Sequence, residues 1–178
     1  MGSRIILPYG TSGNYIQKAI PTDENIKGIN FPSLDEYYDD KSSLYSLEKD
    51  FPIWNAIEQQ YQEWYNWRTT DEETRKFLAP IVGSGYDNNH LPILYFPRFK
   101  PLVDEALVYE YNEIENLVTL GMRAQELGVR EIDLINFLRD LNWVCDCLEL
   151  NIDDIIKNPS NIGFNSDFGL RVIDYGLN

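Results

Sequence analysis

Short stretches in which apolar residues alternate with polar ones predict β-strands in three parts of the chain. Near the N-terminus, residues 4–7 (RIIL) and 15–20 (YIQKAI) flank the turn-rich link PYGTSGN. In the middle, residues 77–85 and 91–99 flank the turn YDNN. Near the C-terminus, NIGF and LRVID flank a turn rich in Asn, Ser, Asp and Gly, which predicts a β-hairpin over residues 161–174. We therefore expect three pairs of strands, widely separated in the sequence.

Apolar residues at helical spacing predict a helix over residues 53–68, between the first two pairs of strands. Asp50 is a residue type that caps helix N-termini, and Pro52 suits the first helical turn. Thr70 and Glu73 have the spacing of a capping box, in which two side chains satisfy backbone N–H groups at a helix start. These signals predict one long helix followed by a brief second one.

The rear half of the chain has the stronger helical pattern. Apolar spacing predicts one helix over residues 103–127, ended by Gly128, and another over residues 131–150. By contrast, residues 21–50 have no clear periodicity, several acids and two prolines, and predict a long, partly ordered surface excursion. A strand-rich front half and a helical rear half indicate the α+β class with two lobes.

Composition limits the kinds of partner that the chain can have. The 178 residues are 43% hydrophobic and 13% aromatic, enough for one folded domain with a proper core. The 29 Asp and Glu outnumber the 15 Lys and Arg, giving a net charge of −14. This charge repels phosphates and anionic lipids, so direct binding to nucleic acid or to a membrane is not expected. A basic protein is favoured instead, for example a nucleic-acid-handling enzyme.

The most concentrated acidic stretch combines carboxylates with aromatic rings. Carboxylates steer the encounter with a basic surface, and tyrosines fix the bound geometry, although a solvated loop is the simpler interpretation of such a run. The candidate partner-binding residues are Asp35, Glu36, Tyr37, Tyr38, Asp39 and Asp40.

Cysteine and histidine content argues against a zinc site. Cys145 and Cys147 are the only cysteines and there is a single histidine, His90. Two positions apart on a helix, the cysteines point about 200° from each other and cannot form a disulfide. Free thiols, together with the lack of a signal peptide or an apolar run of membrane length, predict a cytoplasmic protein.

The predicted hairpin carries the most specific motif of the chain. Asn161 ends the sequence PSN, and Asp174, thirteen positions later, begins DYG. This arrangement resembles the catalytic loop and metal-binding hairpin of protein kinases and of related small-molecule phosphotransferases such as the aminoglycoside phosphotransferases. The resemblance implies that Asn161 and Asp174 hold magnesium on nucleotide phosphates, since amide and carboxylate oxygens suit a hard cation.

The same resemblance implies a two-lobed architecture with a shortened C-lobe, since no residues follow Asn178 to build the later C-lobe helices. Residues 1–102 would be the N-lobe-like strands and helix, and residues 103–178 the truncated C-lobe-like helices and hairpin, together one structural unit. In the family a glutamate on the N-lobe helix pairs with a strand lysine, here Lys18. Glu58 is the expected partner, because it lies about 40° from the centre of the helix's apolar stripe, against about 180° for Glu63.

Departures from the family pattern predict the loss of catalysis. Counting back five from Asn161, the position of the catalytic aspartate holds Ile156, which cannot accept a proton. The nearby Asp153 and Asp154 come too early, and the glycines of YGTSGN do not have phosphate-loop spacing. We expect a non-catalytic kinase-like protein, with no cofactor or only vestigial ATP and Mg, that binds and regulates or inhibits a basic protein partner.

Two alternatives stay open. The acidic, aromatic-rich composition also fits a phage counter-defence inhibitor of a nucleic-acid-binding protein, of the anti-CRISPR or anti-restriction type. A minimal magnesium- and ATP-dependent phosphotransferase would instead use Asp153 or Asp154 as its base, with Asn161 and Asp174 on the metal.

Overall fold

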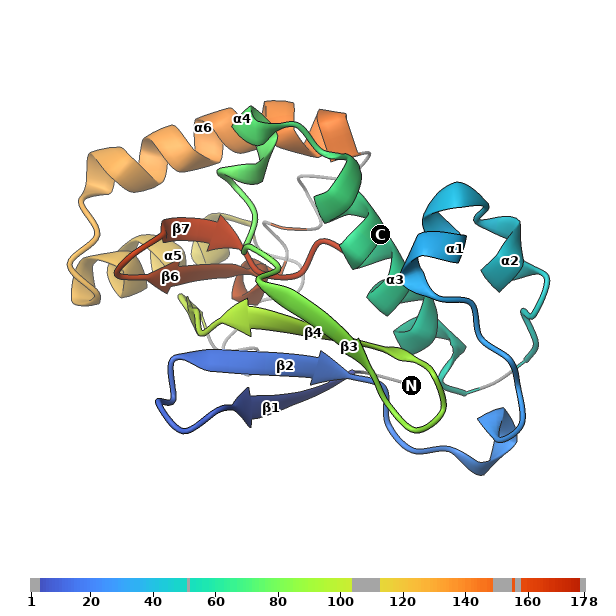
Figure 1. Ribbon diagram of the computed structural model, residues 1–178. Coiled ribbons are helices and arrows are strands. Elements are labelled where there is room, and N and C mark those ends of the chain that lie inside the picture. Colours follow the sequence, from blue (N-terminus) through green and yellow to red (C-terminus); the bar gives the residue numbers. More distant parts are fainter. Residues whose placement is uncertain (1–3, 51, 104–112, 149–154, 156–157, 177–178) are drawn as a thin grey trace. The chain divides into compact units, whose positions relative to one another are not determined.

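The chain is an α+β protein built from helices and antiparallel sheets (Figure 1). The computed structural model describes residues 4–50, 52–103, 113–148, 155 and 158–176. The fold class predicted from the order of the sequence patterns is therefore confirmed at the level of α+β. Within the described residues, no helix is both long enough and apolar enough to span a bilayer.

Two compact units make up the molecule, and the chain passes between them more than once. The first unit contains residues 1–69 and 80–98, and the second contains residues 70–79 and 99–176. The chain passes from the first unit to the second between Arg98 and Phe99. The short segment 70–79, however, leaves the first unit and belongs to the second.

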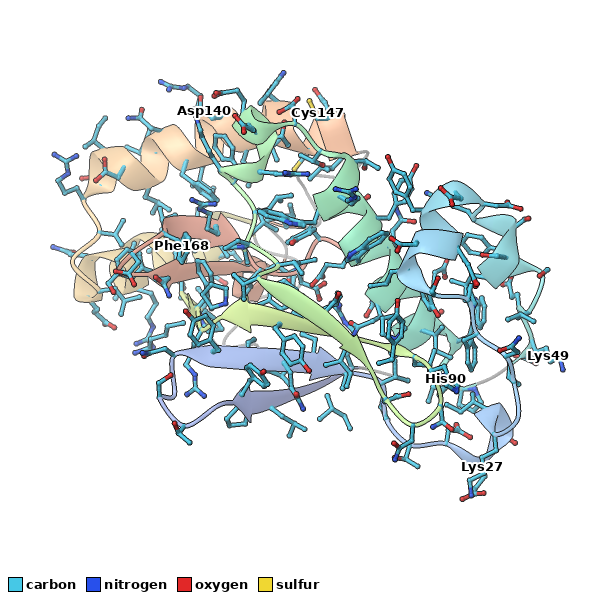
Figure 2. All side chains as sticks on the ribbon, in the orientation of Figure 1. Lys27, Lys49, His90, Asp140, Cys147 and Phe168 are labelled. Atoms are coloured by element: carbon cyan, nitrogen blue, oxygen red, sulfur yellow. The ribbon has the colours of Figure 1, made fainter. Side chains whose placement is uncertain are left out.

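The first unit is organised around a four-stranded antiparallel sheet. Its strands follow the order β1-β2-β4-β3, with the bounds β1 Ile5–Tyr9, β2 Tyr15–Ala19, β3 Gly83–Tyr86 and β4 Pro92–Pro97. The two N-terminal strands and the turn between β3 and β4 are confirmed. Figure 2 shows His90 in that turn, where its backbone has a φ of 62°. Of the strand predicted over 77–85, only the end from Gly83 is extended in this sheet.

Helix α3, Trp54–Thr69, packs against this sheet (Figure 1). Ile57 and Tyr61 on the helix and Leu94 on the sheet are fully buried. The prediction that Asp50 caps this helix is wrong, because the helix begins four residues later at Trp54.

Residues 21–50 combine short regular elements with irregular chain, as the prediction of a partly ordered excursion expects, but part of the segment is buried and not at the surface. They form the 3-10 turn η1 Glu24–Ile26 and the short helices α1 Leu34–Asp39 and α2 Ser42–Tyr45. Side-chain caps start η1 and α1, since Asp23 accepts from the Asn25 N–H and Ser33 forms a capping box with Glu36. Each element is too short to show a helical period. The segment is held by its apolar side chains, of which the buried ones include Ile26, Phe31, Leu34, Tyr37 and Leu44.

The second unit combines helices with a three-stranded sheet of order β5-β6-β7. Its helices are α4 Glu72–Arg75, α5 Glu113–Glu126 and α6 Glu131–Leu148, with the 3-10 turn η3 Pro159–Asn161. Its strands are β5 Lys100–Pro101, β6 Ile162–Asn165 and β7 Gly169–Val172. The β6–β7 hairpin and the helix over 131–148 are confirmed, as is the part of the earlier helix after residue 112.

The segment 70–79 joins this second sheet. Leu78 forms a parallel bridge with Val172 on β7, and the Ala79 N–H donates to the Val172 carbonyl at 2.9 Å. The cap of α4 is Asp71, which accepts from the Thr74 N–H, so the capping box predicted at Thr70 and Glu73 is wrong. Asp71 caps the same first turn that Thr70 was expected to cap. The predicted helix start was therefore wrong by one residue.

Helix α6 packs one apolar stripe into the second unit and turns its other side to solvent. Leu141, Val144 and Cys145 are buried, whereas Cys147 is exposed (Figure 2). Both cysteines are free thiols, as their helical spacing predicts. Burial, with a smaller contribution from the charge of Asp146, raises the pKa of the Cys145 thiol to about 11.

Candidate functional site

A buried ion-pair cluster lies between the sheet and helix α3 in the first unit. The Lys18 Nζ on β2 is 2.6 Å from Glu63 Oε1 on α3, and both side chains are almost fully buried. The Arg4 guanidinium, just before β1, is 3.0 Å from the other carboxylate oxygen of Glu63. The Lys18 ammonium also lies 4.5 Å from the centre of the Phe96 ring. One carboxylate therefore holds two cations away from solvent.

Gln60, one helical turn before Glu63, fixes the position of this cluster. Its amide group donates to the backbone carbonyl of Lys18 at 2.6 Å and to that of Pro92 at 2.8 Å. Its side-chain oxygen accepts from Arg4 at 3.2 Å. Because Gln60 bonds to both β2 and β4, it sets the register of α3 against the sheet and brings Glu63 to Lys18.

Lys18 is thus paired with a helix glutamate as predicted, but the prediction of Glu58 as its partner is wrong. Glu58 is half-buried on another side of α3, near the half-buried Tyr45. The pKa of the Tyr45 hydroxyl is raised mainly by burial, with a smaller contribution from the negative charge of Glu58. Glu58 was expected because it lies near the apolar stripe of the helix, which identifies the buried side only if the helix is buried on one side. Helix α3 is buried on more than one side, and the side facing the sheet carries the polar residues Gln60 and Glu63.

In the second unit, the base of the β6–β7 hairpin brings the two predicted metal ligands near each other. The Ile173 N–H donates to the Asn161 carbonyl at 2.8 Å, and Asp174 is the next residue. Because consecutive Cα atoms are about 3.8 Å apart, the two residues lie at the same end of the hairpin. Both are partly buried.

The amide oxygen of Asn161 and the carboxylate of Asp174 are suitable ligands for a hard cation that takes its other ligands from phosphate or water. Among the described residues, no cluster of three or more His, Cys, Asp or Glu side chains could hold a metal by itself. Magnesium binding by Asn161 and Asp174 stays a prediction. The positions of Asp153, Asp154 and Ile156 lie outside the described residues.

Tyr175, which follows Asp174, anchors this end of the hairpin. Its ring is fully buried, and its hydroxyl donates to the Ala79 carbonyl at 2.7 Å. Beside it, the Arg171 guanidinium on β7 donates to the carbonyls of Arg75 and Leu78, at 3.0 Å each. The segment 70–79 therefore supports the position of Asp174 from outside the hairpin.

The acidic candidate surface lies on and just after helix α1, and its residues differ in what they can do. Asp35 and Asp39 are exposed. Glu36 is committed to the capping box, accepting from the Ser33 N–H at 3.0 Å. Asp40 accepts from the Ser42 N–H at 2.9 Å, and its hydrogen bonds with Ser42 lower the pKa of its carboxyl.

The two tyrosines of this stretch point in different directions. Tyr37 is fully buried among the rings of Tyr61 and Tyr65, so its prediction as a partner-binding residue is wrong. Consecutive helical residues are about 100° apart, so one of the pair faces the core. Tyr38 is 44% exposed and lies edge-on to Trp64, which leaves it as the aromatic group that a partner can reach.

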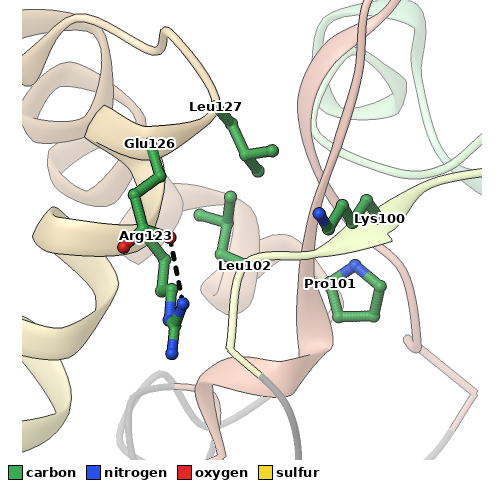
Figure 3. A pocket seen from close by; sticks show the side chains of 6 residues that line it. All are labelled: Lys100, Pro101, Leu102, Arg123, Glu126 and Leu127. Atoms are coloured by element: carbon green, nitrogen blue, oxygen red, sulfur yellow. Dashed lines mark hydrogen bonds and ion pairs between the residues drawn. The ribbon is translucent and has the colours of Figure 1, made fainter.

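A pocket of about 320 Å³ in the second unit was not predicted from the sequence (Figure 3). Three consecutive residues at β5 and three near the end of α5 line it: Lys100, Pro101, Leu102, Arg123, Glu126 and Leu127. The Arg123 guanidinium is 2.9 Å from the Glu126 carboxylate and is neutralised by it. The exposed Lys100 ammonium is therefore the remaining charge on the lining residues, and it does not define a ligand.

No family model, curated protein or solved structure matches this chain. Its functional interpretation therefore depends on the ion-pair cluster, the hairpin base and the exposed acids of α1.

Proposed function

We propose that the chain is a non-catalytic kinase-like protein that binds a basic protein partner and regulates or inhibits it. The buried Lys18–Glu63 ion pair is the observation that carries the kinase-like part of this proposal. In protein kinases a strand lysine that contacts nucleotide phosphates is held by a glutamate of the N-lobe helix. Here a lysine on β2 of the antiparallel sheet is held by a glutamate on α3.

The ion pair needs an explanation beyond stability. Buried ion pairs add little to stability compared with apolar residues of the same size, because both charges lose their hydration. A lysine kept buried and oriented by a carboxylate is therefore consistent with a present or former role in holding an anion. Asn161 and Asp174, brought together by the hairpin, supply the second element of the resemblance.

Phosphotransfer is not expected, because Ile156 occupies the position of the catalytic base. The purified protein incubated with radiolabelled ATP, magnesium and generic protein substrates should transfer no label to them or to itself. Asp174→Ala provides the control. Autophosphorylation that disappears in this variant would contradict the non-catalytic proposal and identify the chain as a minimal phosphotransferase.

The exposed acids of α1 support a basic partner. Exposed charges speed the encounter with an opposite surface, and salt screens them beyond about 8 Å at physiological ionic strength. We expect a partner captured from host lysate to be basic, and its association rate to fall as salt rises. The double variant Asp35→Lys/Asp39→Lys should slow association roughly tenfold without affecting the caps of α1 and α2.

The matched control for this charge reversal is Asp146→Lys/Asp167→Lys. These two acids are also exposed but belong to the second unit, and the change in net charge is the same. If the control slows association as much as the α1 variant does, net charge and not the α1 surface attracts the partner. A neutral or acidic partner would contradict the proposal outright.

A further inference from the structure

One face of the first unit's sheet carries no charged side chain. Side chains alternate between the two faces of a strand, and the strand register puts all odd-numbered residues of β1 to β4 on the same face. These residues number eleven, and none is charged. Because 25% of the chain is charged, with a net charge of −14, this uncharged sheet face differs from the rest of the surface.

The uncharged sheet face is open to solvent. Helix α3 covers the opposite face, where Lys18 and Leu94 are buried. On the uncharged sheet face, large side chains remain exposed: Ile5 by 39%, Leu7 by 43%, Tyr9 by 47% and Tyr15 by 43%. Contiguous exposed apolar surface of this kind marks interaction sites in soluble proteins.

The middle of this face is aromatic. The rings of Tyr9 on β1 and Tyr95 on β4 lie with their centroids 4.2 Å apart. Beside Tyr95, β3 presents Gly83 and Gly85, where an added Cβ would come within 3.4 Å of the tyrosine side chain. Two glycines therefore leave room for Tyr95 to lie across β3.

The free edge of β1 is poorly suited to extending the sheet. The Arg98 N–H donates to the Asn14 carbonyl, so the backbone groups of the even-numbered residues of β2 face β4. The odd-numbered residues of β2 therefore bond to β1, and the backbone groups of Ile6 and Pro8 face away from β2. Pro8 has no N–H to donate at this edge, and an edge proline opposes pairing with another strand. A strand of a partner is therefore disfavoured at the β1 edge of this sheet.

We propose that the uncharged sheet face packs against the same face of a second copy of this chain. In a two-fold interface each group lies near its equivalent in the other copy. Carboxylates placed in this way repel each other, whereas apolar and tyrosine side chains can pack together. Two copies with a net charge of −14 each repel one another least when they meet through a face without charges. A basic partner, in contrast, gains no electrostatic attraction here. The inference goes beyond the proposed function and does not depend on it.

Sedimentation equilibrium over a concentration series tests the proposal. The wild-type chain should pass from its monomer mass of 20.8 kDa to twice that value as its concentration rises. Leu7→Glu places a carboxylate on each half of the interface and should weaken dimerisation about a hundredfold. Tyr15→Glu, on the neighbouring strand, should also weaken dimerisation. It replaces Leu7→Glu as the test if that variant does not fold.

Ile6→Glu is the matched control. Ile6 is the adjacent residue of the same strand, is 60% exposed, and points to the opposite face. This variant has the same net charge as Leu7→Glu and should retain the wild-type dimerisation constant. Thermal unfolding of each variant establishes that it is folded. A wild-type chain that stays monomeric at all concentrations, or a dimer weakened equally by Ile6→Glu and Leu7→Glu, would overturn the proposal.

Discussion

Replacing Glu63 with glutamine is expected to lower the free energy of unfolding by about 3–5 kcal/mol. Glutamine has nearly the same shape, so the change removes charge without creating a cavity. The ammonium of Lys18 and the guanidinium of Arg4 would remain close together and buried, without the charge of Glu63 that pairs with both. Urea denaturation monitored by tryptophan fluorescence measures the loss.

The control for this variant is Glu58→Gln on the same helix. Glu58 is half-buried and does not contact Lys18, so its neutralisation should change stability by no more than about 1 kcal/mol. Equal effects of the two substitutions would mean that the cluster around Glu63 is not the critical feature of α3. The comparison also tests directly which glutamate serves Lys18.

Replacing Gly163 with alanine should destabilise the second unit by about 1–3 kcal/mol. Gly163 is on β6, the central strand of its sheet, and an added Cβ would lie 2.8 Å from Ile173 Cγ2 and 3.0 Å from Phe99 Cβ. The carbonyl oxygen of Lys100 would be only 3.3 Å away. Because backbone and Cβ atoms cannot rotate aside, the hairpin that carries Asn161 and Asp174 must shift.

Gly121→Ala is a control with the opposite expected sign. Gly121 lies within α5, and an added Cβ would meet no atom within 4 Å. Alanine favours the helix there, so this variant should gain up to about 1 kcal/mol. Thermal unfolding of the two variants separates steric crowding from any general effect of removing glycine. A neutral Gly163→Ala would show that β6 is less tightly packed than its contacts indicate.

Several elements are determined by local sequence alone. The alternation in YIQKAI, the long apolar stripe over 131–148 and the glycine-containing turn before β7 each specify an element through interactions within a few residues. The spacing of Asn161 and Asp174 follows from the hairpin for the same reason. Lys18 could likewise be selected, because it is the lysine within a strongly predicted strand.

The partner of Lys18 was decided by tertiary packing. A helical wheel of α3 predicts burial from the distance of each residue to one apolar stripe. This helix, however, packs against the sheet on one side and against α1 on another. The Glu63 carboxylate is paired inside the protein with Arg4, just before β1, and with Lys18 on β2. Gln60, on the same helix, accepts from Arg4 and donates to backbone carbonyls of β2 and β4. The spacing of apolar residues along α3 does not reveal which glutamate contacts Lys18.

Burial within the segment 21–50 was also decided by distant contacts. Its helices are four to six residues long, too short to be stable by themselves, and they form because Leu34, Tyr37 and Leu44 are buried. The same burial removes Tyr37 from the acidic surface and leaves Asp35, Asp39 and Tyr38 exposed.

The sequence by itself thus determines the two N-terminal strands, the helix over 131–148, the residues that the closing hairpin brings together, and the strongly acidic character of the chain. Only the tertiary structure decides that Glu63 serves Lys18, that residues 70–79 join the second sheet, and that one sheet face is left without charge. The physical reason is the range of the interactions. Hydrogen bonds and apolar periods within an element are local, whereas ion pairing, burial and strand register depend on residues far apart in the chain.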